Sequence, residues 1–189
     1  MGGIGSKVSK QYTLSDVESY GIKWQPSMKK LTPDFQQSVI NQIGKMYTEF
    51  PELQGIISQI KVVNGVKTDM GFMDSGPQKG AIIISGDYAN KTINQLGNVG
   101  NFFVADDYSQ LVTHEMAHAV GSLLGANSAF KVFKDINNKS DLSKLSTYAN
   151  DMNDEEKFAE AVTDYMIHGN KAQTVSKQVV SNIHKLLKK

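Results

Sequence analysis

The pentapeptide His114-Glu115-Met116-Ala117-His118 constrains the fold more than any other feature of the 189-residue sequence. Two histidines four positions apart lie about 40° apart around an α-helix, so both imidazoles reach one side only if this segment is helical. The surrounding apolar residues recur at helical spacing, and Gly125 is expected to end the helix. The sequence therefore predicts a helix that begins at Asp106 or Asp107 and presents two imidazoles together.

The same spacing indicates a metal site. Two imidazoles at positions i and i+4 can share one metal ion, and Glu115, about 100° round the helix from His114, suits a base acting on a water molecule beside that ion. The sequence contains no cysteine, so no thiolate can bind a metal. Imidazole and carboxylate ligands without sulfur indicate zinc in a catalytic setting. The alternative is that His114 is a surface residue paired with a carboxylate and that His118 is a buried, hydrogen-bonded one.

A catalytic zinc site needs a third protein ligand. The extended pattern H-E-x-x-H-x-x-G-x-x-H fails, because Gly121 is in place but Leu124 occupies the position of the third histidine. Glu156 and Glu160 are four positions apart on a helix expected at 154–168, on a side that meets its apolar face. Burying them requires a compensating charge, which a metal held by two imidazoles supplies. We therefore predict Glu156 as the third ligand and Glu160 as the acceptor of a hydrogen bond from a ligating imidazole.

A simpler interpretation of these glutamates stays open. Glu156 can close a capping box with Asn153, in which case both glutamates lie in solvent. Asp164, His168 and His184 are weaker ligand candidates, because none of them belongs to a second cluster of ligand residues in the sequence.

One combination of segments resembles a known family. The H-E-x-x-H helix, the pair Thr147-Tyr148 and the segment E-E-K-F-A-E-A at 155–161 are together similar to gluzincin-type zinc metallopeptidases, in particular the minigluzincins and the peptidase domain of anthrax lethal factor. The similarity covers residues 107–169, about a third of the chain. The roles implied by the resemblance are His114, His118 and Glu156 as zinc ligands, Glu115 as general base and acid, Glu160 as support of a ligand, and Tyr148 as the group that stabilises the oxyanion.

The resemblance implies a zinc-dependent endopeptidase that hydrolyses peptide bonds through a metal-activated water. The alternative is a zincin-like binding or structural module, such as a toxin or phage component, with little or no turnover. Glu115 favours catalysis, because a docking module needs no base at that position. Tyr148 can instead pack against the core, and it then takes no part in a reaction.

The pattern of the whole chain predicts an α+β fold: a small single-domain zincin with a short mixed sheet, an active-site helix and a helical C-terminal part. Residues 1–30 mix Gly, Ser and Lys, and we expect a loosely ordered lead-in there. Residues 31–189 are expected to form the metallopeptidase domain.

Two groups of apolar residues predict the strands. The runs at 55–63 and 66–72 flank Asn64-Gly65, which predicts a β-hairpin. The run Ala81–Ser85 predicts a further strand and resembles the edge strand beside the cleft of such peptidases. We expect a peptide or protein substrate to align on Ala81–Ser85 by main-chain hydrogen bonds. The alternative is an interior strand that contacts no substrate.

Composition argues against other classes of partner. The net charge is +1 and every Lys+Arg residue is a lysine, which disfavours a nucleic-acid-binding protein. No apolar run reaches the roughly 18 residues that a membrane-spanning helix needs. We expect the protein to be a monomer. The first residues lack the apolar core of a secretory signal. Gly2 and Ser6 fit the loose N-myristoylation pattern, and a flexible leader accounts for them equally well.

Overall fold

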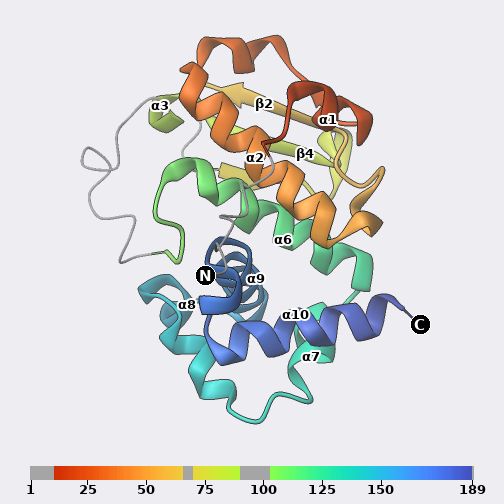
Figure 1. Ribbon diagram of the computed structural model, residues 1–189, viewed down its shortest axis with the longest axis vertical. Coiled ribbons are helices and arrows are strands. Elements are labelled where there is room, and N and C mark those ends of the chain that lie inside the picture. Colours follow the sequence, from red (N-terminus) through yellow and green to blue (C-terminus); the bar gives the residue numbers. More distant parts are fainter. Residues whose placement is uncertain (1–10, 66–69, 90–102, 189) are drawn as a thin grey trace, which may run out of the picture.

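Figure 1 shows two parts of the molecule on either side of helix α6 (Leu111–Leu124): a sheet together with α2 (Pro33–Glu49), and a group of helices formed by the C-terminal part of the chain. The structure is a computed structural model and describes residues 11–65, 70–89 and 103–188. Helix α6 packs against α2 and strand β3 (Met70–Phe72) and also against α9 (Asp154–His168), so it joins the two parts. The predicted α+β class, with a short mixed sheet and a helical C-terminal part, is confirmed.

The four strands of the described residues form one mixed sheet in the order β1-β2-β4-β3. Their bounds are Lys23–Trp24 for β1, Gln59–Val63 for β2, Met70–Phe72 for β3 and Ala81–Ser85 for β4. Strands β1, β2 and β4 are parallel, and β3 runs antiparallel to β4. Strand β4 is therefore paired on both sides, with β2 along its whole length and with β3 from Ile82 to Ile84.

Two predictions about the strands are wrong. Strands β2 and β3 do not form a hairpin across Asn64-Gly65, because β4 lies between them. Ile82 and Ile84 of β4 are fully buried, and an apolar run of this kind is typical of a strand inside a sheet. Strand β4 is therefore not an edge strand, and because its main-chain groups already bond to β2 and β3, Ala81–Ser85 offers no open edge for the predicted alignment of a substrate. The two edges of the sheet are formed by β1 and β3.

Residues 12–30 were expected to belong to a loosely ordered lead-in, but they are built into the fold. They form α1 (Leu14–Ser19), strand β1 and a 3₁₀ helix (Pro26–Lys30). Val17 and Met28 from this segment are fully buried in the same hydrophobic core as α2 and α6. The prediction of loose order is wrong for this segment. Its apolar side chains leave water when they enter the core, and that burial stabilises the packed position.

Tyr12 fixes the beginning of the described chain to α2. Its ring packs over Gly44, where a Cβ atom would overlap the ring, and its hydroxyl lies 2.6 Å from Thr48 Oγ1. Glycine at this point of α2 therefore permits the close approach. Gly2 and Ser6, on which the myristoylation pattern depends, lie outside the described residues.

Helix α6 begins at Leu111, directly after a 3₁₀ turn at Tyr108–Gln110. The Asp107 side chain caps this turn by accepting a hydrogen bond from the Gln110 N–H, so the helical conformation begins beside the predicted residue. Gly125 ends α6 with a φ of 74°, a left-handed value that glycine adopts without strain. Both ends of the predicted helix are thus explained by local chemistry.

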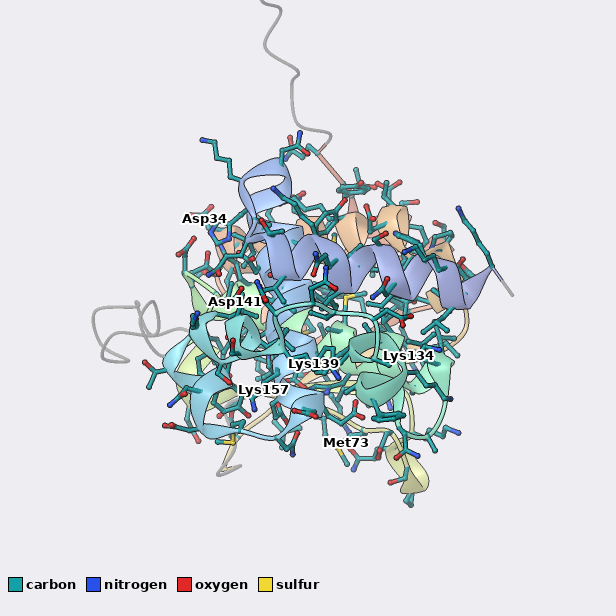
Figure 2. The ribbon with its side chains drawn as sticks, turned by 90° about the horizontal axis from the view of Figure 1, so that it is seen from below. Asp34, Met73, Lys134, Lys139, Asp141 and Lys157 are labelled. Atoms are coloured by element: carbon teal, nitrogen blue, oxygen red, sulfur yellow. The ribbon has the colours of Figure 1, made fainter. Side chains whose placement is uncertain are left out.

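The C-terminal helices cover α6 from the other side. Helix α10 packs against α9 and α7 and crosses the end of the molecule that Figure 2 shows, where Lys139 and Asp141 lie at the surface. No described helix is long and apolar enough to cross a membrane. The remaining α-helices are α3 (Gly86–Ala89), α7 (Ser128–Phe133), α8 (Thr147–Asp151), α9 (Asp154–His168) and α10 (Thr174–Leu187). The remaining 3₁₀ helices are η2 (Pro51–Leu53), η3 (Gly76–Gln78), η5 (Lys139–Lys144) and η6 (Gly169–Lys171).

Candidate metal centre

Three ligand-type side chains from two helices converge on one point. His114 and His118 project from α6, and Glu156 reaches them from the first turn of α9. His114 Nε2 lies 3.0 Å from Glu156 Oε2 and 3.3 Å from His118 Nε2, and His118 Nε2 lies 3.3 Å from Glu156 Oε2. In a tetrahedral zinc site with metal–ligand distances of about 2.0–2.1 Å, neighbouring ligand atoms lie about 3.3–3.4 Å apart. The group therefore has nearly the dimensions of one face of such a site and could hold a metal ion.

The charges of the group also fit a cation. His114 Nδ1 is bonded to Glu160 Oε1 at 2.9 Å, so in a neutral imidazole the Nε2 atom that faces the Glu156 carboxylate carries no proton. Two acceptors at 3.0 Å need a cation or a proton between them. Burial opposes a charge on His114, but its hydrogen bonds to Glu156 and Glu160, together with the charge of Glu115, raise its pKa to about 10. In the absence of metal a proton meets this need, and a metal ion would replace it.

Glu156 is directed to the two histidines because α9 begins just before it. The Asn153 side chain caps α9 by accepting hydrogen bonds from the N–H groups of Glu155 and Glu156. The Glu156 side chain is then free to contact the imidazoles, and hydrogen bonds to His114 and His118 lower the pKa of its carboxyl far below the usual range, against the opposing effect of burial. The structure thus contains the Asn153 cap, but the Glu156 carboxylate lies against the histidines and not in a capping box.

Glu160 lies one turn further along α9 and is fully buried. Its Oε1 bonds to His114 Nδ1, and its Oε2 accepts hydrogen bonds from the Val104 N–H at 2.8 Å and from Ser146 Oγ at 2.6 Å. The carboxylate therefore holds the ring of His114, and a neutral His114 would carry its proton on Nδ1. Sequence reasoning missed Val104 and Ser146, because neither lies near Glu160 along the chain and neither carries a ligand-type side chain.

Glu115 connects α6 to the edge strand. Its Oε2 accepts a hydrogen bond of 2.8 Å from the main-chain N–H of Phe72, the last residue of β3. Glu115, His118 and Glu156 line a cleft of about 500 Å³, together with Phe72 of β3 and Ser128 at the start of α7. The predicted base, two of the predicted ligands and the sheet edge thus share one open cavity.

Tyr148 approaches the group from the side of α8. Its ring centroid lies 5.8 Å from that of His114 and 4.7 Å from that of Phe103. Burial raises the pKa of the Tyr148 hydroxyl well above its ordinary value, and the nearby charge of Glu156 and a hydrogen bond to this carboxylate raise it further. The hydroxyl therefore keeps its proton at neutral pH and lies close to the predicted ligands.

The weaker ligand candidates are not part of this group. His168 Nδ1 lies 2.7 Å from the buried Asp164 carboxylate, within α9 and its C-terminal end. His184 Nε2 lies 2.8 Å from Glu49 Oε1, which joins α10 to the end of α2. Each of these pairs is satisfied locally, so the described residues contain one group of three side chains that could hold a metal.

The chain was compared with protein-family models, with curated proteins and with solved structures, and none of them matches it. The similarity to gluzincins therefore stays a resemblance of motifs, and the function is inferred from the geometry of the site.

Proposed function

We propose that this protein is a zinc-dependent endopeptidase. The observation that carries the proposal is the convergence of His114, His118 and Glu156 at a cleft that His118, Glu156 and Glu115 line. Three protein ligands are typical of a catalytic zinc site, whereas structural sites commonly use four ligands and are rich in cysteine. The donor set, two imidazoles and one carboxylate without sulfur, suits zinc. When bound, zinc would act as a Lewis acid and lower the pKa of a water molecule to about 7.

Glu115 is proposed as the general base. A carboxylate offers about four acceptor sites, so the bond from the Phe72 N–H leaves Glu115 able to accept a proton from the attacking water. The same carboxyl group then donates that proton to the leaving amine. The bond to Phe72 also holds the carboxylate at the sheet edge, where the scissile peptide bond is expected.

Tyr148 is proposed to stabilise the oxyanion. Its raised pKa keeps the hydroxyl protonated, and a protonated hydroxyl can donate a hydrogen bond to the carbonyl oxygen as negative charge develops there. In the absence of substrate the hydroxyl lies near the Glu156 carboxylate, whose charge helps to raise its pKa.

The substrate is proposed to lie along β3 and not along Ala81–Ser85. Strand β3 has β4 on one side, and on the other side Phe72 directs its N–H to Glu115 in the cleft. An extended peptide can add to such an edge by main-chain hydrogen bonds, here to groups of β3 other than the Phe72 N–H, whose hydrogen bond Glu115 accepts. Met73, which follows β3 directly, is 36% exposed and lies at the surface in Figure 2, and its main-chain N–H bonds to the Ala81 carbonyl of β4.

The test combines zinc content with cleavage of an unfolded protein such as casein. The wild type is expected to bind one zinc per chain and to cleave. Glu115→Gln should keep the zinc and lose about 10²–10⁴-fold in activity, because general base catalysis contributes that much. Glu155→Gln is the matched control, since this neighbouring glutamate bonds to Ser128 and the Ala129 N–H of α7 instead of to the triad.

The outcomes separate the candidate functions. Zinc binding without cleavage of casein or of a peptide library would favour a binding module with a metal site. Failure to bind zinc would refute the proposal. Equal activity of Glu115→Gln and the wild type would remove Glu115 from the mechanism.

A further inference from the structure

Ser146 is held between two parts of the site. Its Oγ donates a hydrogen bond to the buried Glu160 carboxylate at 2.6 Å and accepts one from the Ala149 N–H at 3.0 Å. The second bond is the N-cap of α8, the five-residue helix Thr147–Asp151. A helix this short is not stable alone, so its position depends on the cap and on packing. Because α8 carries Tyr148, the direction of the Ser146 hydroxyl influences where the tyrosine lies.

The same carboxylate holds the ligand His114. Glu160 Oε1 fixes His114 Nδ1 at 2.9 Å, and Oε2 receives Ser146 together with the Val104 N–H. Phe103, next to Val104, packs its ring against Tyr148 with centroids 4.7 Å apart. The tyrosine is therefore connected to Glu160 by two routes, through Ser146 and through the segment that contains Phe103.

We propose that Ser146 is a positioning residue, which ties the Tyr148 hydroxyl to the metal ligand His114 through the shared carboxylate of Glu160. A serine hydroxyl has one proton to donate, and here it goes to a carboxylate that cannot donate in return. The lone pairs of the hydroxyl are thereby left for the Ala149 N–H. The Ser146 side chain thus fixes the position of the first turn of α8 relative to Glu160 and His114.

The inference depends on the proposed function for its effect on turnover but not for its effect on metal binding. Zinc affinity is therefore measured first, by competition with a chromogenic chelator. Replacing a residue that supports a ligand typically lowers metal affinity about 10–100-fold, and Ser146 acts one step further away, so Ser146→Ala should weaken zinc binding about 5-fold. Ser146→Thr keeps the hydroxyl and should stay within about 2-fold of the wild type.

Thr32→Ala is the matched control. Thr32 caps α2 in the same way, by accepting a hydrogen bond from the Phe35 N–H at 3.3 Å. Loss of this cap should lower stability to a similar degree and leave zinc affinity unchanged. If Ser146→Ala binds zinc as tightly as Thr32→Ala does, the link from Ser146 to His114 is overturned.

The link to Tyr148 is tested by a double-mutant cycle. Ser146→Ala should lower kcat about 10-fold with little change in KM when Tyr148 is present, but at most about 2-fold in the Tyr148→Phe background, because the positioned hydroxyl is then already gone. Equal effects in both backgrounds would overturn the link.

The same cycle can be followed in zinc affinity, since the Tyr148 ring centroid lies 5.8 Å from that of the ligand His114. If the wild type shows no turnover, the proposed function fails, and the coupling in zinc affinity alone decides for or against Ser146. Coupling between the two substitutions supports the inference, and additivity contradicts it.

Discussion

Replacing Glu160 by glutamine is expected to separate the metal affinity of the site from the stability of the fold. The glutamine oxygen can take the place of Oε2 and keep the hydrogen bonds from the Val104 N–H and from Ser146. Its NH₂ group then faces His114 Nδ1, which must accept a hydrogen bond in place of donating one. Nδ1 then carries no proton, and the one proton of the neutral imidazole stays on Nε2, the atom that the metal would need.

The magnitudes follow from these bonds. In the metal-free protein the His114 Nε2–H can still bond to Glu156, so the variant should fold. Bonds to the fully buried Glu160 change from charge-assisted to neutral, which we expect to lower the free energy of unfolding by about 1–2 kcal/mol. That corresponds to a decrease of about 2–8 °C in Tm for a chain of this size. Zinc affinity should fall about 10–100-fold, as is typical when the partner of a ligating imidazole is replaced.

The measurements are urea unfolding in the presence of EDTA and a zinc competition titration, with the His114 tautomer observed by ¹⁵N NMR. Glu155→Gln on the same helix is the control and should change zinc affinity by less than about 3-fold, because its carboxylate bonds to α7. Zinc affinity equal to that of the wild type in Glu160→Gln would refute the reasoning, since the tautomer of His114 would then not depend on Glu160.

Two further predictions concern the fold. Gly44→Ala should lower the free energy of unfolding by about 1–3 kcal/mol, because displacing the buried Tyr12 ring outweighs the gain of about 1 kcal/mol in helix propensity. In a Tyr12→Ala background the same substitution should be neutral or stabilising, and a stabilising effect in the wild type would contradict the packing argument. Burial, and then the neighbouring Tyr20, raise the pKa of Tyr47, so unfolding releases a proton above about pH 10 and stability falls by up to about 1.4 kcal/mol per pH unit. Urea unfolding between pH 9 and pH 11 should show a smaller fall for Tyr47→Phe, and an identical slope would exclude this residue as a cause.

Local patterns predicted the parts of the site that lie on one helix. The i, i+4 spacing places His114 and His118 on one side of α6 whatever the rest of the chain does. The position of Glu156 was also accessible, since its place on α9 depends on a cap that Asn153 provides. The absence of cysteine limited the ligands to imidazole and carboxylate.

The order of the strands was not accessible in the same way. Asn64-Gly65 is a strong local turn signal, yet β4 inserts between β2 and β3 because its apolar residues are buried best in the interior of the sheet. Which strand borders the cleft therefore depends on burial on both faces of the sheet. The conformational preference of a single turn does not determine it. The edge position of β3, and with it the contact from Phe72 to Glu115, follows from this arrangement.

The sequence by itself determined the helical pair of imidazoles, the glutamate beside them and the α+β class, because these depend on spacing within one segment and on composition. Only the tertiary structure decided that Glu156 closes the triad, that Glu160 receives bonds from Val104 and Ser146, and that residues 12–30 belong to the core. Glu160 and Val104 are 56 positions apart, and Glu160 and His114 are 46 apart. Contacts over such separations form when whole elements pack together, and no local pattern encodes them.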